Sequence, residues 1–166
     1  MSVYQFLILV MYMILLFSCK KEKMVTENTK IEIQLKTSQP IDFSLYYKLD
    51  SLADFNEDQR IHFKISKSDT WTKAMFELPT KDLPTQLMFN FGRDSLLTDI
   101  QLKDFQLNAL NKTIEFENDD LHLFFRYYEF LTYQGEGKYL VFPENGEFNP
   151  YLKTTPFFTQ RLKLVY

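Results

Sequence analysis

Few side chains in this sequence are suited to acid–base or nucleophilic chemistry. The chain has two histidines, His62 and His122, and a single cysteine, Cys19. His62 stands between two apolar residues of an alternating segment, which directs it to the solvent face of a strand, and no neighbour marks either histidine as a general base. The sequence also lacks the nucleophile elbow, the paired-histidine zinc motif and the glycine-rich phosphate loop. It therefore contains no recognisable catalytic motif.

One acidic segment has part of the spacing of a calcium-binding loop. Asp54, Asn56 and Asp58 alternate as the first ligands of such a loop do. The next residue should be a glycine that permits the sharp turn, but it is Gln59, and the final position holds isoleucine instead of glutamate. We interpret the segment as a solvated loop and expect neither a metal nor a cofactor. The acidic segment 115–120 is interpreted as a turn followed by a helix cap.

Cys19 follows a run of residues, 1–18, that contains no charged side chain. This run is short for a membrane-spanning helix, which needs about 20 apolar residues. It suits the apolar core of a signal peptide, which has about 7–15 residues and ends in small ones. The ending Leu16-Phe17-Ser18-Cys19 resembles the lipobox of bacterial lipoproteins, in which the cysteine is joined to a diacylglycerol and the chain is cut before it. The resemblance implies lipidation of Cys19 and removal of the signal peptide 1–18.

An uncleaved membrane anchor is the alternative, because no lysine or arginine precedes the apolar run. Lys20, Lys21 and Lys23 would then favour a cytoplasmic body. The start of the mature chain, "CKKEK", resembles that of many Bacteroidetes lipoproteins. We therefore expect a lipid anchor in the outer membrane of a bacterial cell envelope, with the protein facing the periplasm or the cell surface. Residues 19–29 are predicted to form the lipidated tether, and residues 30–166 the folded domain.

The composition favours β-structure and argues against a nucleic-acid partner. The formal net charge is −3, which leaves no basic footprint over the chain as a whole. The sequence has 17 phenylalanines and 10 tyrosines but only 4 glycines, and aromatic residues are enriched in strands. Because the single cysteine cannot form an internal disulfide, the domain must be stabilised by its apolar core.

Apolar and polar residues alternate over many short segments. This pattern predicts a mostly β fold, namely an antiparallel β-sandwich of jelly-roll type with one wet face on each sheet. The alternation slips by one position at Phe105, which indicates a bulge. The segments are 31–35, 41–47, 61–65, 74–78, 87–91, 100–102 and 114–116. The residues expected in the core include Phe43, Leu45, Phe63, Phe76, Leu87 and Phe89.

Two later segments are less regular. Residues 121–133 have apolar side chains at helical spacing, so we predict one short helix there, with a strand as the alternative. Near the C-terminus Leu162, Leu164 and Tyr166 alternate, which favours a final strand.

Exposed aromatic rings are the best candidates for ligand binding. Tyr46 and Trp71 fall out of phase with the core positions of their strands, so their rings are predicted to lie on outer faces, where a sugar ring can stack. Tyr127 and Tyr128 could contribute to such a surface. The alternative is that these rings pack in or around the core.

The segment from residue 41 to 107 resembles small sandwiches of the carbohydrate-binding-module type found in Bacteroidetes envelope proteins. The resemblance rests on four short motifs, and Met88 and Asn90 replace an arginine and an aspartate that usually precede the glycine in that family. No ligand-binding residue can therefore be carried over. The motifs are Tyr46-Tyr47, Phe55-Asn56-Glu57, Phe76-Glu77-Leu78-Pro79 and Phe91-Gly92.

Taken together, these features predict a non-enzymatic, lipid-anchored envelope protein that binds a glycan or an envelope protein partner. One alternative is a glycan hydrolase with paired carboxylates, and another is a purely structural subunit of an envelope complex. Two carboxylates across a groove would favour the hydrolase, whereas an open aromatic face would favour the binding module.

Overall fold

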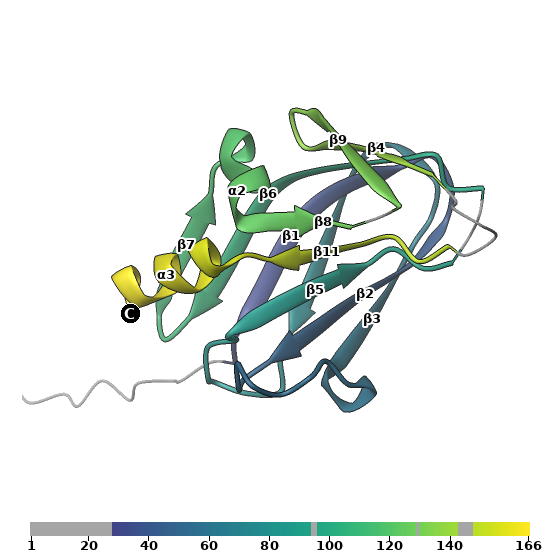
Figure 1. The fold of residues 1–166 in the computed structure, drawn as a ribbon. Helices are drawn as coiled ribbons and strands as arrows, with labels where there is room; N and C mark the ends of the chain where they lie inside the picture. The colour runs from purple at the N-terminus through teal and green to yellow at the C-terminus, as the bar shows by residue number, and fades with distance from the viewer. Residues whose placement is uncertain (1–27, 94–95, 129, 143–147) are drawn as a thin grey trace, which may run out of the picture.

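The computed structural model describes residues 28–93, 96–128, 130–142 and 148–166. Within these ranges two antiparallel sheets face each other, with a few short helical segments at the margins (Figure 1). The mostly β sandwich fold predicted from the alternation is therefore confirmed. The predicted signal peptide, Cys19 and most of the tether lie outside the described residues. No helix in the described ranges is long and apolar enough to cross a membrane.

The first sheet has the strand order β4-β1-β6-β10-β9, and β7 pairs with the remaining part of β6. Its longest strand, β6, contacts three neighbours and joins the two halves of the sheet. The strands are β1 (Lys30–Thr37), β4 (Ser68–Glu77), β6 (Asp99–Ala109), β7 (Lys112–Phe116), β9 (Leu131–Gly135) and β10 (Lys138–Val141).

The second sheet has the order β3-β2-β5-β11-β8, so that β2, β5 and β11 are central and β3 and β8 lie at its edges. Its strands are β2 (Ile41–Lys48), β3 (Arg60–Ile65), β5 (Gln86–Asn90), β8 (Phe125–Tyr127) and β11 (Tyr151–Thr154). The 3₁₀ turn η1 (Glu57–Gln59) precedes β3, and a second one, η2 (Asn118–Asp120), precedes α2 (Leu121–Phe124).

Phenylalanine rings fill the space between the two sheets. The Phe43 ring of β2 stacks between Phe89 and Phe91, with centroid distances of 5.5 and 5.3 Å, and meets Phe76 of the first sheet edge-on at 5.4 Å. Five of the six expected core residues are buried, but Phe63 is only partly so. Its strand, β3, is at the edge of the second sheet, where a side chain has neighbours on one side only.

The phase slip in β6 is a bulge. Asp104 has a φ of 50°, and the register between β1 and β6 shifts between Glu32 and Gln34. The Asp104 carboxylate accepts a hydrogen bond from Gln34 Nε2 at 2.9 Å, and the Asp104 N–H donates to the side chain of Asn118. The extra residue is therefore bonded on both sides, which fixes the register that the sequence indicated.

The predicted helix at 121–133 is wrong beyond Phe124. The helix α2 ends there, and the chain continues as β8, in which Phe125 is buried against the core. The predicted C-terminal strand is also wrong, because this segment forms the helix α3 (Pro156–Val165). Proline suits the first helical turn, and Phe158 and Leu162, four residues apart, are buried on one face of α3. In Figure 1, α3 lies beside β7, and Lys112 of β7 donates to the carbonyl of Val165.

The turn between β9 and β10 lies close to β6, and Gly137 in this turn allows a specific test of that contact. Gly137 has a φ of 72°, and a Cβ there would lie 2.0 Å from the carbonyl oxygen of Leu102. We expect Gly137→Ala to lower the free energy of unfolding by more than the ~1–3 kcal/mol that a strained positive φ costs alone, because the added Cβ also clashes with the backbone of Leu102. Gly135→Ala is the matched control, since it also has a positive φ but no heavy atom within 4 Å of the added Cβ. Equal losses in urea denaturation would contradict the close approach of the turn to β6.

Candidate functional site

Tyr46 lies on the outer face of the second sheet, as its phase in β2 predicted. Its hydroxyl donates a hydrogen bond to Glu57 Oε1 at 2.9 Å, and the Arg60 guanidinium carbon lies 5.3 Å from its ring centroid. Arg60 also forms an ion pair with Glu57. The half-buried ring is therefore held in one orientation by a carboxylate and a cation.

A hollow beside Tyr46 has a volume of ≈ 580 Å³, which is within the usual range for small-ligand sites. Its floor is formed by outward side chains of β2 and β5, and its walls by the segment before β3, the first residue of β3 and three residues from other loops. The side chains of Asn90 and Asn149 lie together in it, since Asn90 Nδ2 donates to Asn149 Oδ1 at 2.7 Å. The lining residues are Asp42, Tyr46, Phe55, Asn56, Glu57, Arg60, Met88, Asn90, Gly92, Arg93 and Asn149. We call this cavity the Tyr46 hollow.

Phe55 holds the loop between β2 and β3 against the sheet. The ammonium groups of Lys48 and Lys153 each lie 5.2 Å from its ring centroid. Lys48 is buried and also donates to the carbonyl of Ser51 at 3.2 Å. These contacts fix the wall of the Tyr46 hollow, because they join the loop to both β2 and β11.

Hydrogen bonds and burial shift the pKa values of Glu57 and Tyr46 in opposite directions. Hydrogen bonds from Arg60 and then Tyr46 lower the pKa of the exposed Glu57 carboxyl. Burial first, and then the bond to Glu57, raise the pKa of the Tyr46 phenol. Near neutral pH, Glu57 is therefore an ionised acceptor and Tyr46 a neutral phenol, a pairing that suits recognition of hydroxyl groups.

A serine–histidine pair next to Tyr46 was missed by the sequence analysis. Ser44 Oγ lies 3.0 Å from His62 Nδ1, and Arg60 Nε donates to Ser44 Oγ at 3.4 Å. The exposed position of His62 was predicted, but its partner depends on the pairing of β2 with β3. Ser44 is only 1% exposed, so its hydroxyl is not accessible as a nucleophile. The pair instead connects Arg60 to the sheet beneath it.

Trp71 lies on β4, in the first sheet, so the two candidate aromatic residues do not belong to one site. Ammonium groups of Lys36 and Lys103 lie 4.7 and 4.6 Å from its ring centroid. These cations come from the outward positions of β1 and β6, which places the ring on the outer face of the first sheet. The ring is thus partly exposed but covered by two lysine side chains, and its role in binding stays a prediction.

The acidic loop uses its polar atoms for local structure. Asn56 caps η1 by accepting a hydrogen bond from the Gln59 N–H at 3.0 Å. In the part of the chain that the structure describes, no group of three or more histidine, cysteine, aspartate or glutamate side chains could hold a metal ion. Cys19, the predicted lipidation site, lies outside that part.

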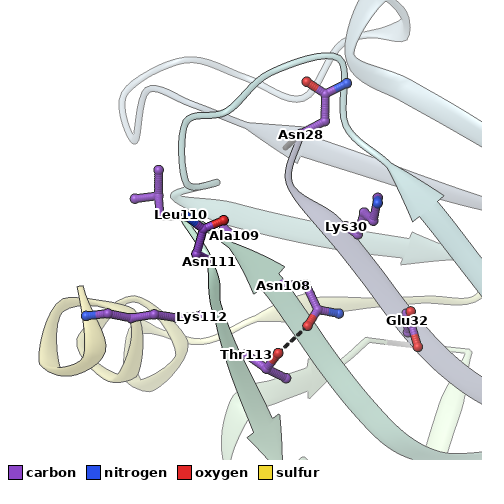
Figure 2. Close-up of a pocket in the computed structure, with 9 residues that line it drawn as sticks. All are labelled: Asn28, Lys30, Glu32, Asn108, Ala109, Leu110, Asn111, Lys112 and Thr113. Atoms are coloured by element: carbon purple, nitrogen blue, oxygen red, sulfur yellow. Dashed lines mark hydrogen bonds between the residues drawn. The ribbon is translucent and has the colours of Figure 1, made fainter. Parts of the chain in front are cut away.

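Two other hollows differ in character from the one at Tyr46. One hollow, with a volume of ≈ 340 Å³, lies beside the turn between β6 and β7 and is lined by this hairpin, β1 and Asn28 (Figure 2). Its residues are tied to the fold, since Thr113 donates to Asn108 and Lys112 points away toward α3. A larger hollow of ≈ 960 Å³ lies between α2, β8 and the start of α3, and contains both Tyr127 and Tyr128. We call it the Tyr127 hollow.

The Tyr46 hollow also bears on the alternative of a glycan hydrolase. It contains two carboxylates, Asp42 and Glu57. Glycoside hydrolysis needs a carboxyl group with a raised pKa to act as the general acid, whereas the pKa of Glu57 is lowered by its hydrogen bonds. Glu57 is therefore suited to accepting hydrogen bonds from a ligand and unsuited to donating a proton.

No family model matches the chain, and no curated protein and no solved structure shows significant similarity to it.

Proposed function

We propose that this protein is a lipid-anchored, non-enzymatic binding module of a bacterial cell envelope, and that it recognises a glycan at the Tyr46 hollow. The lipid anchor follows from the lipobox-like sequence that ends at Cys19. The observation that carries the binding function is a half-exposed tyrosine ring, fixed by Glu57 and Arg60, in a hollow lined by side-chain amides.

The chemistry of the Tyr46 hollow suits a carbohydrate. The C–H face of a sugar is apolar and packs on an aromatic ring, while its hydroxyls both donate and accept hydrogen bonds. Tyr46 supplies the ring, Glu57 the acceptor, and Asn90 and Asn149 both donors and acceptors. Since the Arg60 and Phe55 contacts already order this wall, little conformational entropy is lost when a ligand binds.

Tyr46→Ala is expected to weaken glycan binding about tenfold or more, because it removes the stacking surface and releases Glu57. Binding would be measured by isothermal titration against hits from a glycan array. The melting temperature should change little, because the ring lies outside the core. Tyr46→Phe is the matched control, since it keeps the ring and removes only the bond to Glu57, and a smaller loss is expected.

Trp71→Ala tests the other candidate surface in the same assay. A weaker effect than that of Tyr46→Ala is expected, because two lysine side chains cover the Trp71 ring. If Tyr46→Ala unfolds the protein, or if only Trp71→Ala reduces binding, the assignment to the Tyr46 hollow is wrong. Glycan cleavage that disappears with a single carboxylate substitution would support the hydrolase instead.

A further inference from the structure

Strand register aligns five side chains in one row across the outer face of the second sheet. Each is the direct partner of the next, so the row crosses all five strands. Neighbouring strands lie about 4.8 Å apart, which gives the row a length of about 19 Å. In order from β3 to β8, its members are Arg60, Tyr46, Met88, Lys153 and Arg126.

This row connects the two larger hollows on the same face. Tyr46 and Met88 line the Tyr46 hollow, whereas Lys153 and Arg126 line the Tyr127 hollow. Phe55 marks the boundary, since its ring contacts Lys48 on one side of β5 and Lys153 on the other. The surface therefore offers two adjacent subsites to an extended ligand.

The outward positions of these five strands concentrate positive charge in a chain whose formal net charge is −3. Asp42 is the one carboxylate among them, against five cations. Arg60 is neutralised by Glu57, but Lys153 and Arg126 have no carboxylate within ion-pair distance among the described residues. The cations are Lys48, Arg60, Lys64, Arg126 and Lys153. Two of these cations without an ion pair, Lys153 and Arg126, lie together at the Tyr127 hollow.

The Tyr127 hollow has further features that suit a sugar ligand. Phe157 lines it and is 60% exposed. Gln86 also lines it, and the buried Oε1 atom of Gln86 has no hydrogen-bond partner among the described residues. A buried acceptor without a partner is costly, so Gln86 would gain a hydrogen bond if its side chain turned toward a ligand hydroxyl.

We infer that this face binds an acidic glycan, with one sugar ring on Tyr46 and a carboxylate of a neighbouring sugar at Lys153 and Arg126. This inference rests on the proposed function and specifies its ligand class. Charge complementarity at Lys153 and Arg126 favours an anion, and the exposed aromatic rings favour a sugar. Asp42 and Glu57 in the Tyr46 hollow supply acceptors for the hydroxyls of a sugar.

The test compares charged sugars with their uncharged derivatives. Hexasaccharides of galacturonate, mannuronate and guluronate, and the methyl esters of each, would be titrated into the protein. At least one acid form should bind about tenfold more tightly than its ester, and its affinity should fall as salt is raised. Arg126→Gln should weaken the acid about tenfold and leave the ester unchanged. Arg161→Gln on α3 is the matched control with the same loss of charge, and no change is expected.

The outcomes separate this inference from the proposed function. Equal affinities of acid and ester that both depend on Tyr46 would overturn the acidic ligand and leave glycan binding intact. The absence of binding to every uronic hexasaccharide would overturn the acidic ligand, and the absence of any hit on the glycan array would overturn the proposed function as well.

Two further controls test whether the face binds any anion. Protein lacking the lipid would be titrated with a single-stranded oligonucleotide and with phosphatidylglycerol vesicles. If either binds as tightly as the acidic glycan, the surface is an unspecific anion surface and the inference is overturned. The melting temperature of Arg126→Gln must match that of the unsubstituted protein, since Arg126 is exposed.

Discussion

Replacing Cys19 by alanine is expected to abolish the incorporation of labelled fatty acid into the protein almost completely. The thiol of this residue is the predicted acceptor of the diacylglycerol, and the chain contains no other cysteine. In the unsubstituted protein, mass spectrometry should find Cys19 as the first residue, carrying acyl chains. Stable anchoring needs more than one chain, because each buried CH₂ contributes only about 0.8 kcal/mol and a single chain binds marginally.

Ser18→Ala is the matched control for this experiment. It keeps a small residue before the cysteine, so lipidation and cleavage should proceed as in the unsubstituted protein. The competing interpretation, an uncleaved membrane anchor, makes the opposite prediction for the unsubstituted chain. An unmodified Cys19 that is still attached to residues 1–18 would show that the lipoprotein prediction is wrong.

The strands were predictable because a two-residue period assigns each side chain to one face of a sheet. In β1, the residues Ile31, Ile33 and Leu35 alternate with polar ones, and all three are buried. The same period led to a wrong prediction of a strand at the C-terminus, because Leu162 and Leu164 alternate with polar residues as in a strand. Only Leu162 is buried there, and its partner is Phe158, four residues earlier on the same face of α3. Pro156 was the available signal, since it favours the start of a helix.

The outward position of Tyr46 was predictable for the same reason, but its neighbours were not. Tyr46 contacts Arg60 because β2 and β3 pair in one particular register, and a sequence shows alternation without showing register. The bond between Ser44 and His62, and the row that ends at Arg126, depend on pairings of the same kind. The sequence also does not show which strands lie at the edge of a sheet. The edge location of β3 explains why Phe63 is less buried than Phe43.

Phe43→Ala is expected to lower the free energy of unfolding by about 3–5 kcal/mol, because it leaves a cavity in a closely packed aromatic cluster. Phe43 is fully buried and contacts the rings of Phe76, Phe89 and Phe91. A domain of this size has a total stability of about 5–15 kcal/mol, so the loss is a large fraction of it. Urea denaturation followed by circular dichroism would measure the change.

Phe157→Ala removes the same atoms from a ring that is 60% exposed and should cost less than about 1 kcal/mol. The difference between these two truncations therefore measures burial, and equal losses would contradict the facing arrangement of the two sheets around Phe43. The comparison also bears on the binding face, because Phe43 points inward between Asp42 and Ser44, which point outward. Because Glu57 and Arg60 hold Tyr46 from the outer face, Phe43→Ala should reduce glycan binding only in proportion to the unfolded fraction, and the protein that remains folded should bind with unchanged affinity.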